Sequence, residues 1–163
     1  GNNAGARSFF DGMAARGVQW DVTGLSHYSY WHGPLPALQS NLNDIASRYD
    51  KPVIVVETSY PFTLDNADAE ENIVNVLSPS SQMTFDYPIS PAGQSDNLRD
   101  IMTVVKSVPD GRGRGVFYWE PTWTAVPGNG WDPTNPQLGN NWENQALFDF
   151  DNRPLPAMKW FQP

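Results

Sequence analysis

Hydrophobic positions follow two spacings along the 163-residue chain, and their alternation predicts helices interleaved with strands. Apolar residues three and four apart predict helices over residues 4–16, 36–49 and 96–107. Short apolar runs predict strands over residues 18–26, 52–57 and 115–119. The run Val53–Val56 consists only of β-branched residues, which is typical of a parallel strand covered on both faces. A short apolar segment follows at 146–150, and the pattern at 156–161 predicts the beginning of a last helix.

This order of elements predicts right-handed βαβ units and a parallel sheet, and therefore an α/β fold. Two long connections, residues 58–90 and 120–145, follow predicted strands. Eight-stranded barrels and open doubly wound sheets both build their sites from such loops, so the pattern leaves both folds open. A complete barrel needs roughly 200 residues, and three strands would leave apolar edges uncovered. We therefore expect a second chain, or the rest of a longer protein, to complete the sheet.

Composition narrows the possible functions. The net charge of −8, with only ten Lys and Arg, argues against nucleic acid as a partner. The sequence has no apolar run long enough for membrane insertion, and without cysteine it has no disulfide or thiolate site. Gly1 is not an initiator residue, so a leader peptide could have preceded it. Seven Trp, many in loop sequence, favour a carbohydrate cleft, although any single Trp could be a structural anchor.

Two predicted strands are each followed by a glutamate. Glu57 comes directly after Val53–Val56, and Glu120 follows the run 116–119. Paired carboxylates at a cleft are the groups that hydrolyse glycosidic bonds. From the residues alone these two glutamates could be such a pair. A strand-end glutamate that meets solvent or a structural arginine is the equally weighted alternative.

The first predicted strand leads into a segment rich in hydroxyl and ring side chains, His27–His32. We expect the Tyr28 hydroxyl to donate to a carboxylate nucleophile and keep it ionised. His27 and His32 are too isolated for a zinc site, which needs three or four convergent ligands. We interpret the two histidines as sugar contacts or as loop structure.

A third candidate site is the acidic loop at residues 65–72 (DNADAEEN). Oxygen side chains at short intervals suit Ca²⁺, which takes six to eight oxygen ligands. The same residues also suit the beginning of a helix, where Asp65 or Asp68 would act as the N-cap. The residues alone do not decide between these two interpretations.

Four stretches of the chain together resemble glycoside hydrolase family 53, the arabinogalactan endo-β-1,4-galactanases. They are DVTGLSHYSYWHG at 21–33, IVVETSYP at 54–61, GVFYWEPTW at 115–123 and NQALFDFDNRPLP at 144–156. The resemblance implies that residues 1–163 are the C-terminal part, about strands six to eight, of a single (β/α)₈ TIM-barrel catalytic domain. It implies endo-acting, retaining hydrolysis of β-1,4-galactan, with Glu57 as the nucleophile.

The resemblance also implies roles for other residues. Trp119 would form the floor of the subsite that holds the sugar to be cleaved, and Glu120 would bind substrate hydroxyls instead of pairing with Glu57. Further substrate-binding residues would be Asp21, Tyr28, Trp31, His32 and Trp123. The acid/base glutamate of the family follows an asparagine, and no Asn-Glu dipeptide precedes Glu57. We therefore expect it on the N-terminal half of the barrel, as a separate or missing segment.

A structural Ca²⁺ and an exported enzyme are two further implications. Bacterial members of the family can carry Ca²⁺ between two loops, and the matching positions here are Asp65, Asp68, Asn72 and Glu143. A galactan-degrading enzyme is expected to be secreted, at the cell surface or periplasmic. The alternatives are a related glycanase that acts on another β-1,4-glycan and a non-catalytic, sugar-binding half-barrel.

Overall fold

The computed structural model describes residues 2–78 and 82–161. The chain falls into two compact units, Gly1–Thr58 with Asp100–Phe117, and Ser59–Arg99 with Tyr118–Pro163. Within the described residues, no helix combines the length and apolar character needed to cross a membrane.

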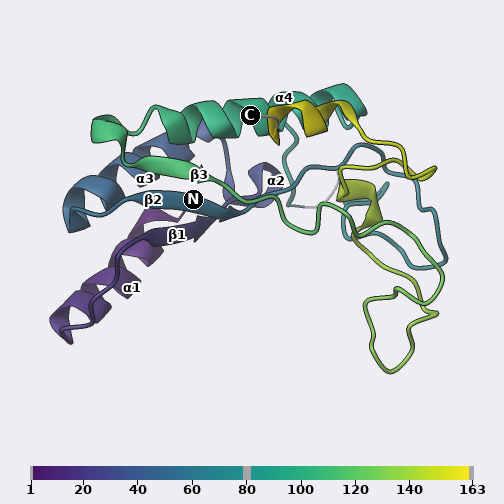
Figure 1. Cartoon of the computed structure of the whole chain (residues 1–163), viewed down its shortest axis with the longest axis horizontal. Coiled ribbons are helices and arrows are strands. Elements are labelled where there is room, and N and C mark those ends of the chain that lie inside the picture. The colour runs from purple at the N-terminus through teal and green to yellow at the C-terminus, as the bar shows by residue number, and fades with distance from the viewer. Residues whose placement is uncertain (1, 79–81, 162–163) are drawn as a thin grey trace. The chain divides into compact units, whose positions relative to one another are not determined.

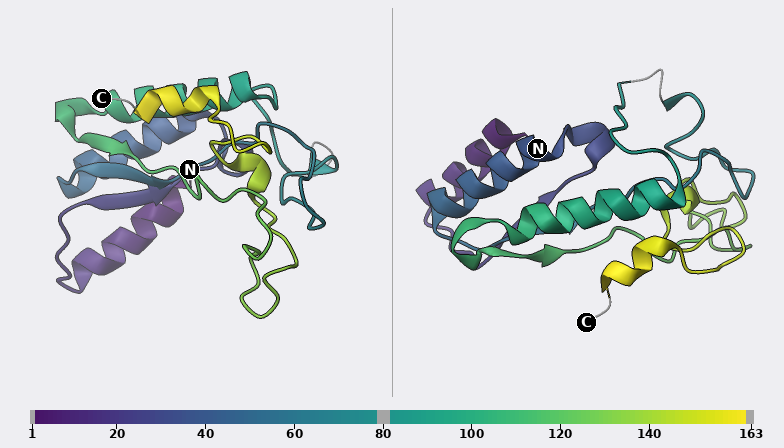
Figure 2. Two further views of the ribbon diagram at one scale, coloured as in Figure 1. Left: turned by 45° about the vertical axis from the view of Figure 1, so that its right-hand side comes forward. Right: turned by 90° about the horizontal axis from the view of Figure 1, so that it is seen from above.

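The first unit contains a three-stranded parallel sheet, which confirms the predicted α/β arrangement. Its strands lie in the order β1 (Thr23–Ser26), β2 (Val53–Glu57) and β3 (Gly113–Val116) (Figures 1 and 2). The other elements of this unit are α1 (Asn3–Ala15), α2 (Ser29–His32), α3 (Leu35–Tyr49) and the 3₁₀ helix η2 (Pro109–Gly111). Helix α4 (Pro91–Lys106) contributes residues to both units.

Helix α1 ends where the sequence predicts. Gly17 follows the helix with φ of 68°, a conformation that glycine adopts without steric cost. The N–H groups of Gly17 and Val18 donate to the carbonyls of Ala14 and Met13, which satisfies two of the last carbonyls of the helix. Helix α3 also lies close to its predicted range, so the apolar spacing located both helices.

Two strand predictions were wrong in their bounds. Strand β1 begins at Thr23, five residues later than predicted, and β3 spans Gly113–Val116 instead of 115–119. Gly113 explains the second error, because glycine adds nothing to an apolar pattern. A Cβ atom at Gly113 would lie 1.7 Å from the Val105 carbonyl oxygen, so only glycine fits where β3 passes the end of α4.

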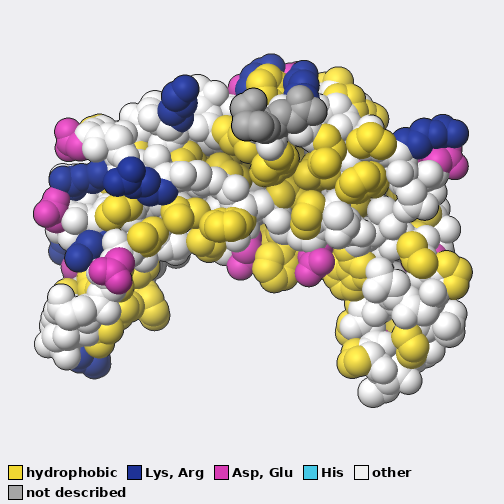
Figure 3. Space-filling model, in the orientation of Figure 1, with side chains coloured by type: hydrophobic (Ala, Val, Ile, Leu, Met, Phe, Trp, Pro, Cys, Tyr) yellow, Lys and Arg dark blue, Asp and Glu magenta, His cyan; other side chains and the backbone are white. Residues whose placement is uncertain are grey.

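One face of β2 is covered and the other is open. Val53 and Val55 are fully buried in a core shared with Leu42, Ile101 and other side chains of α3 and α4. Val56, with its side chain on the opposite face, remains 38% exposed. The expectation that this run is covered on both faces is therefore wrong for the described chain. Apolar side chains also lie at the surface over α1 and β1 (Figure 3).

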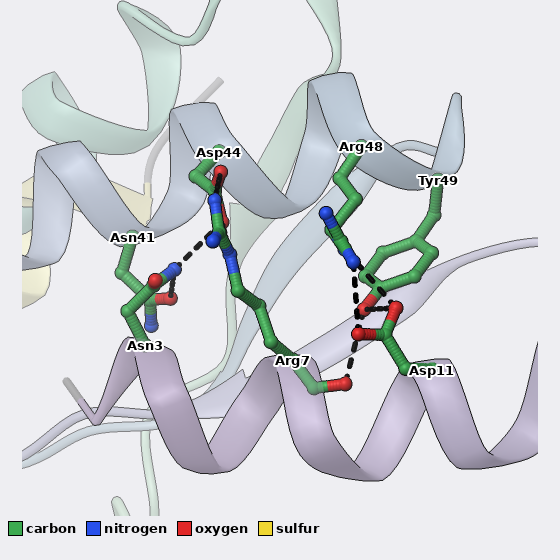
Figure 4. Close-up of polar contacts among 7 residues, drawn as sticks. All are labelled: Asn3, Arg7, Asp11, Asn41, Asp44, Arg48 and Tyr49. Atoms are coloured by element: carbon green, nitrogen blue, oxygen red, sulfur yellow. Dashed lines mark hydrogen bonds and ion pairs between the residues drawn. The ribbon is translucent and has the colours of Figure 1, made fainter.

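Polar contacts join α1 to α3 (Figure 4). Arg7 donates to both carboxylate oxygens of Asp44, with Nε to Oδ2 at 2.7 Å. Arg48 donates to Asp11 in the same bidentate manner, at 3.0 and 2.9 Å. The Tyr49 hydroxyl adds a bond to Asp11 at 2.9 Å. These contacts fix the register of the two helices.

The second unit has little regular structure besides its part of α4. It contains the 3₁₀ helices η3 (Glu143–Gln145) and η4 (Pro156–Phe161), so the predicted last helix is 3₁₀ instead of α. Buried side-chain amides connect its loops. Gln94 Nε2 donates to the carbonyls of Tyr60 and Ala146, both at 2.9 Å. A buried backbone group left unpaired typically costs about 1–3 kcal/mol, so such amides stabilise loops that lack a sheet ladder.

Candidate active site

Glu57 is the last residue of β2, at the carboxyl end of the parallel sheet. The pairing of β1 with β2 shifts register between Leu25 and Ser26, which places Ser26 opposite Glu57. The His27 N–H then donates to the Glu57 carbonyl at 2.9 Å. The irregularity therefore brings the residues after β1 alongside the end of β2.

Tyr28 contacts the Glu57 side chain directly. Its hydroxyl donates to Glu57 Oε2 at 3.0 Å, and its ring is buried, with 5% of the residue exposed. A bond between two residues 29 positions apart fixes one oxygen of the carboxylate. The other oxygen, Oε1, takes no part in this bond.

The short helix α2 gathers rings around Tyr28. The Trp31 ring packs edge-on against the Tyr28 ring at 5.4 Å, and the His32 ring lies 5.9 Å from it. Trp31 remains 43% exposed, so its face is available to a ligand. Asp21 precedes β1 and lies at the amino end of the strand, so the structure does not bring it to Tyr28 and Glu57.

His27 is a buried ring that packs beside this group, with its centroid 6.1 Å from that of the His32 ring. It is fully buried, and neither ring nitrogen has a hydrogen-bond partner among the described residues. Burial lowers the pKa of His27 to about 3, so the ring is neutral near pH 7. Nothing in the sequence pattern indicated this depth of burial.

Trp119, Glu120 and Trp123 belong to the second unit. Glu120 does not directly end a strand, because β3 stops at Val116. It has φ of 51°, which is uncommon for a residue with a side chain. A polar cavity of about 350 Å³ is lined by Glu120, Thr122, Trp123, Asn129 and Gly130. Trp119 is 42% exposed.

Three of the four predicted metal ligands lie together in the second unit. Glu143 Oε1 accepts the N–H groups of Ala67 and Asp68, at 2.5 and 3.4 Å, and Asn72 Nδ2 donates to the same oxygen at 3.4 Å. The Asp65 carboxylate accepts the Thr63 hydroxyl at 3.0 Å, while the Asp65 main-chain carbonyl accepts Asn72 Nδ2 at 3.2 Å. Among the described residues, no three His, Cys, Asp or Glu side chains are arranged to hold a metal ion, so amide or main-chain oxygens would have to complete a Ca²⁺ site.

The electrostatics of this cluster fit a hard cation. Glu143 is fully buried, and burial, with the nearby Asp68 carboxylate, raises the pKa of Glu143. Glu143 Oε2 and Asn72 Oδ1 are buried without a hydrogen-bond partner among the described residues. Buried carboxylates are normally paired or bind metal, and oxygen donors are what Ca²⁺ prefers. The residues present therefore fit the implied Ca²⁺ better than they fit a helix beginning, which the structure does not form here.

Comparison with known proteins identifies a family for this chain. The model of glycosyl hydrolase family 53 matches residues 1–161. A Niallia circulans protein of the bgaB 5′ region is 45% identical over 160 residues, covering 96% of this chain and 41% of that protein. An endo-β-1,4-galactanase of Bacillus subtilis is 37% identical, covering 98% of this chain and 42% of the relative.

A solved structure gives the same result. The family 53 catalytic domain of Ignisphaera aggregans superposes with a TM-score of 0.86 at 37% identity, covering 95% of this chain and 42% of that domain. The chain thus spans about two fifths of the length of the proteins it matches. From the extent of the match and the shared fold, the chain belongs to glycosyl hydrolase family 53.

Proposed function

We propose that this chain forms part of the catalytic barrel of an endo-β-1,4-galactanase that retains anomeric configuration, with Glu57 as its nucleophile. The supporting observation is the bond from Tyr28 to Glu57 at the carboxyl end of β2, the end at which parallel barrels build their sites. The substrate is inferred from relatives that are named endo-β-1,4-galactanase and arabinogalactan endo-β-1,4-galactanase.

The proposed reaction has two steps. Glu57 Oε1 attacks the anomeric carbon of a galactosyl residue, and the bond from that carbon to the leaving oxygen breaks. A second carboxylic acid, about 5–5.5 Å from Glu57 in retaining enzymes, protonates the leaving oxygen. The same group then takes a proton from water, and this water cleaves the glycosyl ester and regenerates Glu57. Tyr28 holds Oε2 during both steps, so that the attacking oxygen keeps its direction.

The second carboxylic acid is proposed to come from the remaining segment of the barrel. Two observations support such a segment: the chain spans about two fifths of its relatives, and one face of β2 leaves Val56 exposed. An eight-stranded barrel fills its interior with such side chains. The five further strands would pair with the free edges of β1 and β3.

The proposed sugar contacts lie on exposed aromatic and polar side chains. Trp31 and Trp119 are 43% and 42% exposed, and a galactosyl ring can stack on such faces. Glu120 and Trp123 share a polar cavity that suits sugar hydroxyls. Galactan is a polymer that does not cross membranes, so the proposal includes export from the cytoplasm.

Structural Ca²⁺ is the second part of the proposal. Asp68, Asn72 and Glu143 would hold the ion, and Asp65 would support the loop through its bond with Thr63. When bound, the ion supplies positive charge to a buried carboxylate and connects two loops of the second unit. It takes no part in bond cleavage.

Replacing Glu57 with Gln in the complete barrel tests the proposed chemistry. We expect galactan hydrolysis to fall by at least about 10³-fold, while galacto-oligosaccharide binding persists. Glu71→Gln, at an exposed loop position, serves as the matched control. Turnover by Glu57→Gln at the control rate would exclude Glu57 as the nucleophile.

A substrate panel separates the alternatives. Comparison of galactan, mannan, xylan and cellulose distinguishes a galactanase from a related β-1,4-glycanase. Oligosaccharide binding without turnover of any of the four would favour the non-catalytic half-barrel.

A further inference from the structure

We infer that His32 is a positioning residue that holds Tyr28 in the conformation from which its hydroxyl reaches Glu57. The inference rests on the proposed function, since it concerns the same nucleophile. It assigns His32 a role different from direct sugar contact, the role that the family resemblance implies.

The contacts of His32 single it out. The imidazole Nδ1 of His32 accepts the Tyr28 main-chain N–H at 3.1 Å. The main-chain N–H of His32 donates to the Tyr28 carbonyl at 2.8 Å. Both main-chain polar groups of Tyr28 are thus bonded by one residue, four positions further along. Helix α2 has only four residues, so these bonds are a large part of what holds this turn.

The position of the Tyr28 backbone determines where the hydroxyl lies. The ring extends from that backbone to Glu57, and the bond to Oε2 is 3.0 Å long. A small rotation of the Tyr28 backbone is amplified along the ring and breaks the bond, because hydrogen bonds weaken steeply with distance and angle. His32 therefore acts on Glu57 through Tyr28.

The hydrogen bond from the Tyr28 N–H to His32 Nδ1 determines which substitutions of His32 test the inference. Nδ1 must be an acceptor, so the neutral ring carries its proton on Nε2. Asparagine places an oxygen acceptor at the same position along the side chain, whereas leucine fills similar space and offers none. His32→Asn should thus keep the contact and His32→Leu should lose it.

Kinetics of the complete barrel on galactan test the inference. For His32→Leu we expect kcat to fall about 10-fold with KM changed by less than about 2-fold, and for His32→Asn we expect kcat within about 3-fold of wild type. In a Tyr28→Phe background, His32→Leu should lower kcat by less than about 2-fold further, because the bond it supports is already gone. The inference would be overturned if the two substitutions lowered kcat by independent factors that multiply in the double variant. It would also be overturned if His32→Leu raised KM and left kcat unchanged.

A readout independent of turnover separates this inference from the proposed function. The ¹³C resonance of the Glu57 carboxyl group reports its bond with Tyr28. His32→Leu should shift this resonance toward its position in Tyr28→Phe, and His32→Asn should leave it near wild type. A resonance unmoved by His32→Leu overturns the inference whether or not the protein hydrolyses galactan. Absent hydrolysis with the expected shifts would count against the proposed function alone.

Discussion

One hydrogen bond, from Tyr28 to Glu57, connects the residues that follow β1 with the end of β2. Its donor is buried and its acceptor carboxylate ends the central strand of the sheet. Hydrogen bonds to charged groups contribute about 1.5–3 kcal/mol, which is enough to change a rate by one to two orders of magnitude. The free energy of such a bond is therefore large enough to affect a catalytic rate.

Tyr28→Phe in the complete barrel should lower kcat on galactan by about 10- to 100-fold, because Glu57 loses the donor that orients it. Tyr49→Phe is the matched control, since it removes a hydroxyl that bonds to Asp11 within the same unit. We expect the control to leave kcat within about 2-fold of wild type. Equal losses in the two variants would point to lost stability instead of lost orientation.

At this scale the sequence predicted part of the site. The pairing of Tyr28 with Glu57 was predicted from a hydroxyl-rich segment and a strand-end carboxylate, and the structure confirms the contact. The bond from the Tyr28 main-chain N–H to His32 Nδ1 was not predictable, because it depends on a turn of four residues whose geometry no apolar pattern encodes. Asp21 was grouped with the site by the family resemblance, but it precedes β1 at the amino end of the strand, away from Tyr28 and Glu57.

At the scale of elements, some helices and strands were located closely and others were not: β2 lies within one residue of its prediction, whereas α4 begins at Pro91, five residues before its predicted start. Apolar spacing placed α1 and α3 within about one residue, since each buries one stripe of its surface. Strand β3 contains two glycines among its four residues, so its position depends on close packing against the end of α4 instead of on apolar side chains. The buried amides of the second unit gave no signal either, because Gln94 and Asn144 resemble surface residues in sequence.

The stability that the contact between α1 and α3 contributes should depend on pH. The hydrogen bond that Asp44 accepts from Arg7 lowers the pKa of Asp44 from 3.8 to about 2. A carboxyl group with a lowered pKa in the folded state stabilises the fold at pH values above 3.8, and this contribution is lost as the pH falls through about 2.

Asp44→Asn should therefore lower Tm slightly near neutral pH and flatten the dependence of Tm on pH between about 4 and 2. Thermal unfolding followed by circular dichroism at several pH values measures this. Asp110→Asn, at an exposed position of η2, is the control and should leave the slope unchanged. A slope for Asp44→Asn equal to that of wild type would refute the role of this ion pair.

At the scale of the whole molecule, the two units depend on different stabilising interactions. The first has an apolar core between its sheet and its helices, and the second combines buried apolar side chains, such as Tyr60 and Leu147, with buried polar groups that connect its loops. The sequence predicted the first by its periodicity. It indicated the second only as two long loops, because bonds between residues far apart in the chain leave no local pattern.

Millimolar Ca²⁺ should raise the Tm of the protein, because a ligand that binds only the folded state stabilises it by about 2.7 kcal/mol at 100 times its Kd. Glu143→Gln should remove this response, and Glu71→Gln should keep it. Mg²⁺ should be less effective, since it requires a stricter octahedral geometry. A Ca²⁺ response that survives Glu143→Gln would place the ion elsewhere.

The most direct measurement concerns the identity of the nucleophile. A 2-deoxy-2-fluoro-galactobioside with a good leaving group should glycosylate the nucleophile of the complete barrel, and the glycosyl-enzyme should be hydrolysed slowly enough to be trapped. Mass spectrometry of its peptides should then find the added sugar on Glu57. A label on any other residue, or turnover of galactan without a trappable intermediate and with inverted configuration, would contradict the assignment of Glu57.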